Sequence, residues 1–183
     1  MEVKSTCPRI YLAGPDVFFP DSKQIFKNLL AHCERLGMVG LVPSDGGMSH
    51  GFSGTDDQLA QRIYDGNVAL MRSADGVIAN LVAFRGSEPD SGTAFEVGFA
   101  AALQKPVVVY GVPEESYASR VATVIPSSRD AEGNLRETGS GVLVEGLGQR
   151  MNLMLTRSTA MAVDAESALA MLQTLIANGV RAD

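Results

Sequence analysis

The sequence is poor in the side chains that metal centres, disulfides and membrane helices require. Its 183 residues contain no tryptophan, two histidines and two cysteines. Because His32 and His50 are the only imidazoles, a zinc site built on three histidines is excluded. Cys7 and Cys33 show no metal-ligand spacing, and so few cysteines favour a reduced, cytoplasmic chain. No stretch approaches the roughly eighteen apolar residues of a membrane helix, so no membrane contact is expected.

Positive charge is also scarce. Lys and Arg number 15 against 21 Asp and Glu, which gives a formal net charge of -6 at pH 7. Nucleic acid polymers are bound largely through Lys and Arg contacts to phosphates, so no nucleic acid partner is expected. Hydrophobic residues make up 45% of the chain, which is enough to bury a core. This length and composition predict a single domain over residues 1–183.

Short apolar runs alternate with helical periodicity along the first two thirds of the chain. The runs predict strands and the stretches between them predict helices: strands at 9–14, 38–42, 75–82 and 106–110, and helices at 21–36, 56–73 and 93–103. This order predicts a doubly wound α/β fold, in which helices flank a parallel sheet. The strands are almost continuously apolar, which indicates burial on both faces of the sheet.

The last third is harder to interpret. Residues 112–150 are polar and rich in Gly and Ser, and a structureless loop of that length is uncommon in a compact domain. We therefore expect an insertion that forms a loop or a hairpin, with a turn at residues 130–134. Residues 151–155 are expected to open a short helix, and residues 165–178 to form the final one. Two further loops are expected at 44–55 and 84–92.

Ligands of open parallel sheets bind beside the carboxyl ends of the strands. The loop after the first predicted strand, residues 14–19, begins with Gly14, which allows the backbone to approach a ligand. Phe18 in this loop stacks on a planar ring in one interpretation and packs into the core in the other. Tyr11, inside the strand, has a hydroxyl that reaches a carboxylate on a neighbouring strand end or simply packs.

A second candidate segment, DSGTAFEVG at residues 90–98, carries two carboxylates. Glu96 lies among small and apolar neighbours, which leaves room for a ligand; the alternative is a solvated residue that complements the helix dipole. Asp90 precedes the helix and is either its N-cap or one half of a carboxylate pair. Such a pair suits glycosidic chemistry, because one group attacks the sugar and the other handles the leaving group's proton.

Several segments, in this order and spacing, resemble the nucleoside 2-deoxyribosyltransferase family. They are IYLAGP at residues 10–15, ADGVIAN at 74–80 and DSGTAFEVG at 90–98. NLML at residues 152–155 resembles the family's C-terminal motif. The resemblance implies a flavodoxin-like fold and an enzyme that exchanges nucleobases on 2-deoxyribose. Its ligands would be 2-deoxynucleosides and free nucleobases, with no cofactor or metal.

The resemblance also implies roles for individual residues. Glu96 matches the family's nucleophile, Asp90 the residue that helps to protonate the base, and Tyr11 the residue that holds the nucleophile. Asn152 and Met154 match residues that reach the sugar site of a neighbouring subunit, which implies a homo-oligomer with a shared site. The expected substrate-binding residues are Gly14, Pro15, Asp16, Phe18, Asn67, Ser91, Gly92, Asn152 and Met154.

The sequence departs from the family at one base-contacting position. Several members have an aspartate where this chain has Asn67, with Asp65 two residues away. An amide donates as well as accepts, whereas an ionised carboxylate only accepts. This difference bears on base preference and leaves the sugar chemistry unchanged.

The implied reaction is a retaining double displacement through a covalent Glu96 intermediate. One alternative is an N-glycosidase that hydrolyses 2-deoxynucleoside 5-monophosphates. Against it, the loop at 14–19 is acidic and aromatic, and Asp16 is expected to repel a phosphate. The other alternative is a nucleotide-binding module without catalysis, in which Glu96 lies on the surface.

Overall fold

The computed structural model describes residues 7–43 and 52–179, and the loop expected at 44–55 lies mostly outside them. Five parallel strands form one sheet in the order β2-β1-β3-β4-β7. The strands are β1 (Arg9–Ala13), β2 (Val39–Leu41), β3 (Gly76–Asn80), β4 (Val107–Tyr110) and β7 (Ala160–Met161). This order confirms the doubly wound, flavodoxin-like α/β fold.

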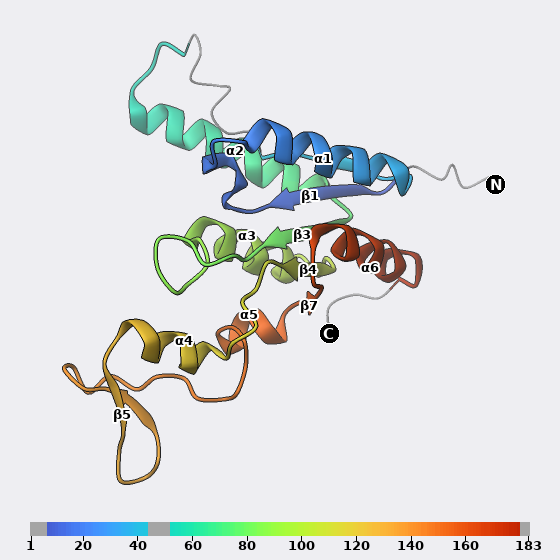
Figure 1. Cartoon of the computed structure of the whole chain (residues 1–183). Coiled ribbons are helices and arrows are strands. Elements are labelled where there is room, and N and C mark those ends of the chain that lie inside the picture. Colours follow the sequence, from blue (N-terminus) through green and yellow to red (C-terminus); the bar gives the residue numbers. More distant parts are fainter. Residues whose placement is uncertain (1–6, 44–51, 180–183) are drawn as a thin grey trace.

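Helices cover both faces of the sheet (Figure 1). On one face lie α1 (Ser22–Arg35) and α6 (Ala165–Ala177), and on the other α2 (Asp56–Ser73) and α3 (Ser91–Ala102). The described chain also forms the 3-10 turn η1 (Pro15–Phe18) and the helices α4 (Tyr117–Val124) and α5 (Leu153–Arg157). Successive strand side chains point to opposite faces. Ile10 and Leu12 therefore join the core under α1 and α6, whereas Tyr11 and Ala13 join the core under α2 and α3.

Local capping explains where two of the helices begin. Thr55 and Gln58 form a capping box at the start of α2, with bonds of 3.2 and 2.9 Å, which offsets the weakening effect of Gly66. The Asp90 side chain accepts from the backbone N–H of Thr93 at 2.8 Å. Helix α3 therefore starts at Ser91, two residues before the predicted position.

The segment 112–150 contains more regular structure than the sequence pattern predicted. Its turn at 130–134 connects the antiparallel strands β5 (Ser127–Arg129) and β6 (Leu135–Glu137), as expected for a hairpin. Helix α4 was not predicted, and neither was the two-residue strand β7 that follows the segment. In Figure 1 this gold and orange segment projects from the sheet.

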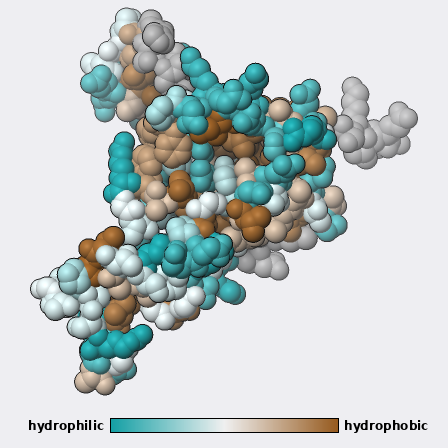
Figure 2. Space-filling model, in the orientation of Figure 1, coloured by the Kyte–Doolittle hydropathy of each residue, from teal (hydrophilic) through white to brown (hydrophobic). Residues whose placement is uncertain are grey.

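The projecting segment carries apolar side chains on its surface. Figure 2 shows brown patches there, and its exposed large apolar residues include Val124, Val142, Leu143 and Leu147. In the part of the chain that the structure describes, no helix is both long and apolar enough to span a bilayer.

Candidate active site

A cavity opens where the strand order reverses. β2 lies on one side of β1 and β3 on the other, so the loops after β1 and β3 diverge and leave a crevice between them. The cavity there has a volume of about 440 Å³, within the usual range for small-molecule sites. We call it the Glu96 cavity; its lining is Gly14, Val17, Phe18, Pro43, Ile63, Asn67, Asp90, Gly92, Thr93 and Glu96.

Glu96 is half-buried on α3 and is held by a buried phenol. The hydroxyl of Tyr11, which is 0% exposed on β1, donates to Glu96 Oε1 at 2.5 Å. These residues are 85 positions apart in the sequence, and the packing of α3 on β1 brings them together. A solvated helix residue would have no such partner, so the alternative of a surface Glu96 is wrong.

Burial dominates the electrostatics of this pair. It raises the pKa of Glu96 to about 7, the charge of Asp90 raises it as well, and the hydrogen bond from Tyr11 lowers it. Burial and the neighbouring Glu96 also hold the pKa of Tyr11 far above its usual value. Tyr11 therefore remains a donor, and the raised pKa of Glu96 places its titration close to neutral pH.

Asp90 combines capping with a position on the cavity wall. Its Oδ2 accepts from both the backbone N–H and the hydroxyl of Thr93, at 2.8 and 3.0 Å. Its Oδ1 makes no hydrogen bond to any described residue. A Cβ on Gly92 would come within 3.0 Å of this carboxylate. Ser91, beside it, is exposed and does not line the cavity.

The loop after β1 forms the opposite wall. Phe18 lines the cavity, is 59% exposed and stacks on Phe84, with ring centroids 5.6 Å apart. The guanidinium of Arg85 lies 4.7 Å from the Phe84 ring centroid and 5.6 Å from that of Phe18. Pro15 is buried at the start of η1 and does not line the cavity. The loop therefore offers one aromatic ring to a ligand, with a cation beside it.

Asp16 lies behind this wall and not in it. Its side chain is 4% exposed and accepts from Asn80 Nδ2 at 2.9 Å. The η1 turn directs it towards the end of β3, which the sequence pattern of the loop does not reveal. The argument that Asp16 repels a phosphate therefore loses its basis, because its carboxylate does not face the cavity.

Helix α2 contributes Asn67 to the cavity, and Ile63 one turn earlier. Asp65 is exposed and accepts from Gln61 Nε2 at 2.9 Å. The amide of Asn67, and not the nearby carboxylate of Asp65, therefore lines the cavity. Ile63 was missed, although its spacing of four from Asn67 places both on one helix face. Three other lining residues were also missed, and no sequence pattern indicates them: Val17, Pro43 and Thr93.

The C-terminal motif lies outside the Glu96 cavity of its own chain. The Asn152 side chain caps α5 by accepting from the N–H of Met154 at 2.9 Å. Its Nδ2 donates to Glu145 at 3.0 Å, and Glu145 also accepts from the N–H of Leu153 at 2.7 Å. Met154 is 71% exposed.

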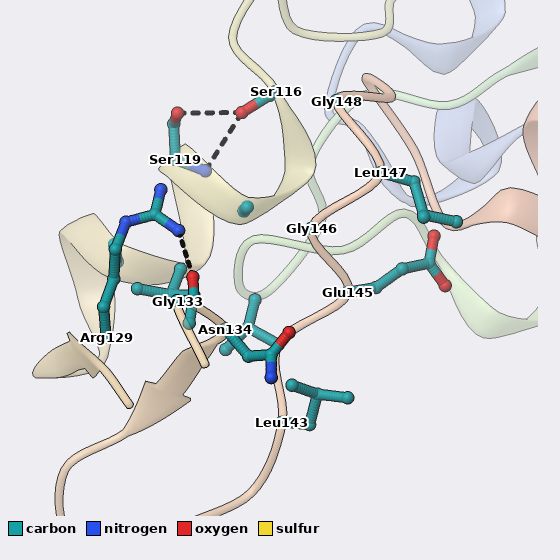
Figure 3. Close-up of a pocket in the computed structure, with 14 residues that line it drawn as sticks. Ser116, Ser119, Arg129, Gly133, Asn134, Leu143, Glu145, Gly146, Leu147 and Gly148 are labelled. Atoms are coloured by element: carbon teal, nitrogen blue, oxygen red, sulfur yellow. Dashed lines mark hydrogen bonds between the residues drawn. The ribbon is translucent and has the colours of Figure 1, made fainter. Parts of the chain in front are cut away.

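A second cavity of about 690 Å³ lies between α4, the hairpin and residues 143–148. Figure 3 shows its polar groups bonded to one another, Ser116 with Ser119 and Arg129 with the Gly133 carbonyl at 2.6 Å. It shares no lining residue with the Glu96 cavity. Within residues 7–43 and 52–179, no three His, Cys, Asp or Glu side chains are grouped to hold a metal ion.

The fold and the site together define a flavodoxin-like α/β protein whose switch-point cavity carries a pair of carboxylates. The chain belongs to the nucleoside 2-deoxyribosyltransferase family, whose model matches residues 10–154. It is similar to a 2-deoxyribosyltransferase from Leishmania mexicana, at 32% identity and a TM-score of 0.72, over 91% of this chain and 97% of that one.

The chain is also similar to two further proteins, one by structure and one by sequence. A 2-deoxyribosyltransferase from Bacillus psychrosaccharolyticus superposes with a TM-score of 0.58 at 19% identity, over 90% of this chain and 95% of that one. An uncharacterized protein of Schizosaccharomyces pombe is 30% identical over 159 residues, which is 80% of this chain and 74% of that protein.

Proposed function

We propose that this protein transfers the 2-deoxyribosyl group between nucleobases of 2-deoxynucleosides. The observation that carries this proposal is the carboxylate of Glu96, held by Tyr11 at 2.5 Å on the wall of a cavity whose volume suits a small molecule. A nucleophile that forms a covalent bond must keep a fixed orientation, and the buried phenol provides it. Family membership and the transferase from Leishmania mexicana support the same reaction.

In the first half-reaction, Glu96 attacks the anomeric carbon of the deoxyribose. A bond forms between a carboxylate oxygen and C1, the glycosidic bond breaks, and its electron pair leaves with the base. The protonated form of Asp90, on the same wall, gives the departing base its proton and becomes a carboxylate. The product is a deoxyribosyl ester of Glu96 and a free base. The 2-deoxy sugar favours this step, because no electron-withdrawing 2-hydroxyl destabilises the cationic transition state.

In the second half-reaction, another nucleobase attacks C1 and displaces Glu96. Asp90 takes the proton that the incoming base loses, which restores both carboxyl groups to their starting states. Two inversions at one carbon give net retention. Water in place of the second base would give free deoxyribose, so exclusion of water from the cavity sets the ratio of transfer to hydrolysis.

The direct test is mass spectrometry of the protein after rapid mixing with a 2-deoxynucleoside and acid quenching. We expect a deoxyribosyl adduct on the peptide that contains Glu96, and none in a Glu96→Gln variant. An adduct on another peptide would contradict the assignment of the nucleophile. Turnover without any adduct in the native chain would contradict the covalent mechanism.

Replacing Tyr11 by Phe is expected to move the acid limb of the kcat/KM profile to higher pH. Glu96 attacks in its ionised form, so activity is lost as the pH falls through its pKa of about 7. The hydrogen bond from Tyr11 lowers this pKa, and its loss therefore raises it. Profiles of the native chain and the variant measure the shift. An unmoved limb, or one moved to lower pH, would contradict the role of Tyr11.

We further propose that the active site is completed by a neighbouring subunit. Asn152 and Met154 do not line the Glu96 cavity of their own chain, and the exposed Met154 is available to another chain. Exposed aromatic rings of Tyr64 and Phe95, 6.2 Å apart between centroids, lie on α2 and α3 beside the cavity. An apolar surface of this kind suits a subunit contact.

Mixing two inactive variants is expected to restore activity if the site is shared. Glu96→Gln removes the nucleophile, and Asn152→Ser removes the amide while keeping a residue type that caps helices. In a mixed dimer one site receives both native residues, so equal mixing after dissociation should restore about a quarter of the native activity. Each variant alone is the control. No recovery, in a mixture shown by mass to contain mixed oligomers, would contradict a shared site.

One observation favours a second candidate, the hydrolysis of 2-deoxynucleoside 5-monophosphates. The Arg85 guanidinium, beside Phe18, has no ion-pair partner among the described residues, and a phosphate would pair with it. An assay of deoxyinosine plus adenine against a deoxynucleoside monophosphate alone separates the two functions. Hydrolysis that requires the phosphate, without base exchange, would overturn the transferase proposal.

A further inference from the structure

Behind the wall of the Glu96 cavity, the buried Asp16 and the partly buried Asn80 join the loop after β1 to the end of β3. Asn80 Nδ2 donates to Asp16 Oδ1 at 2.9 Å, across 64 positions of sequence. Asn80 Oδ1 in turn accepts from the backbone N–H of Val82 at 3.2 Å. The η1 turn is thereby connected through side chains to the strand beside it.

Two glycines leave the space that this pair occupies. Gly14 has φ +155 and Gly111 has φ +72. A Cβ on Gly14 would collide with the Asp16 carboxylate, and a Cβ on Gly111 would collide with the amide oxygen of Asn80. Burial also raises the pKa of Asp16, so keeping a carboxyl group here opposes folding unless it is hydrogen-bonded. The two glycines therefore make room for a hydrogen-bonded polar pair. Packing alone would be satisfied by an apolar contact at this place.

The pair lies directly beneath residues that form the cavity wall. Asp16 is in the middle of η1, and the two residues that follow it, Val17 and Phe18, line the cavity with Glu96. On the solvent side the same two loops meet again, through the stack of Phe18 on Phe84. Two contacts therefore hold the wall in place: the hydrogen bond between Asp16 and Asn80 on its inner side, and the stack of Phe18 on Phe84 on its solvent side.

We propose that Asp16 is a positioning residue for substrate binding: through Asn80 it fixes η1, so that Val17 and Phe18 form the wall that faces Glu96. Asp16 itself does not touch the substrate. The identity of the bound molecule as a nucleoside or a nucleobase rests on the proposed function, whereas the ordering of the wall does not. A pair that serves only global stability would leave substrate affinity unchanged in variants that remain folded.

The chain has no tryptophan, so Phe18→Trp introduces a single fluorescent reporter on the wall. In this background Asp16→Ala and Asn80→Asp are each expected to raise the acrylamide quenching constant about twofold, because η1 opens locally. Asp16→Asn keeps the acceptor oxygen and should stay near the parent. The exchanged double variant Asp16→Asn/Asn80→Asp reverses the direction of the hydrogen bond, and is expected to return quenching to the parent value.

Kinetics in the chain with native Phe18 provide the second measurement. Asp16→Ala and Asn80→Asp should raise the KM for the nucleoside about tenfold with a much smaller change in kcat, and the exchanged double variant should restore it. Asn28→Asp is the matched control, since Asn28 accepts from Gln24 at 2.8 Å on the exposed face of α1, and it should change neither quantity.

Unchanged quenching in the single variants would overturn the proposal, as would an unchanged KM in variants whose quenching has risen. Failure of the exchanged double variant to restore either quantity would also overturn it. If Asn80→Asp does not fold, the comparison of Asp16→Ala with Asp16→Asn decides. If the parent exchanges no bases, the proposed function fails by itself, and the quenching series still tests whether Asp16 orders the wall.

Discussion

Replacement of Glu96 by Gln is expected to abolish base exchange, with a fall in kcat on the order of 10⁴-fold or more. The amide has no nucleophilic oxygen, but it matches the carboxylate in shape and still accepts from the Tyr11 hydroxyl. The variant should therefore fold and still bind a nucleobase. Base exchange followed by chromatography gives the rate, and circular dichroism gives the folded state.

The matched control is Glu34→Gln, which makes the same chemical change at an exposed position of α1 and should leave the rate unaltered. Retention of most of the turnover by Glu96→Gln would contradict the mechanism. Ligand binding without turnover in the native chain would instead favour a nucleotide-binding module.

The same substitution is expected to stabilise the fold at alkaline pH. Burial raises the pKa of Glu96 from its usual 4.5 to about 7, so the folded chain holds this proton more tightly than the unfolded chain. The contribution of Glu96 to stability is therefore largest below pH 4.5 and is lost as the pH rises through about 7. Gln has no proton to lose. The melting temperatures of the native chain and Glu96→Gln should diverge as the pH rises from 4.5 to about 7, and the variant should be the more stable of the two above pH 7.

The fold could be predicted because each strand of the sheet's centre is apolar on both faces. Ile10 and Tyr11 are neighbours in sequence, and both are buried in separate cores on opposite faces of the sheet. The edge strand β7 and the helix α4 could not be predicted from the sequence pattern. β7 has only two residues, which is too few for any periodicity. Helix α4 has eight residues within a polar segment, and Ser116, whose hydroxyl accepts from the N–H of Ser119 at 3.2 Å, is the N-cap signal that could have revealed its start.

The site could be predicted only where the sequence determines which way a side chain points. A residue on a regular element has a fixed orientation, yet the sequence pattern alone left Tyr11 either reaching a carboxylate or packing. Its pairing with Glu96, which the structure shows as a hydrogen bond, was implied only by the family resemblance. A residue in an irregular loop has no such fixed orientation, and the carboxylate of Asp16 turned out to face Asn80 behind the wall. The contact between Phe18 and Phe84 has the same origin, because both rings lie on loops whose path depends on the whole sheet.

Replacement of Asp90 by Asn is expected to lower kcat by about 10²- to 10⁴-fold, the usual contribution of a general acid, and by much less when the leaving base needs no proton. Asn caps helices as well as Asp does, so the bond to the N–H of Thr93, 2.8 Å in the native chain, should survive. Asp90→Ala would lose this cap as well. Equal melting temperatures for the native chain and Asp90→Asn, with a lower one for Asp90→Ala, would separate capping from catalysis.

The leaving group supplies the decisive comparison. In 7-methyl-2-deoxyguanosine the base already carries a positive charge and departs as a neutral molecule, so loss of the proton donor should matter little. We therefore expect Asp90→Asn to cleave this substrate at a rate within about tenfold of the native chain, while deoxyinosine is cleaved far more slowly.

The charge of Asp90 also raises the pKa of Glu96, so the acid limb of the variant should move to lower pH, opposite to the shift expected for Tyr11→Phe. Equal losses on both substrates would assign Asp90 to binding and not to proton transfer.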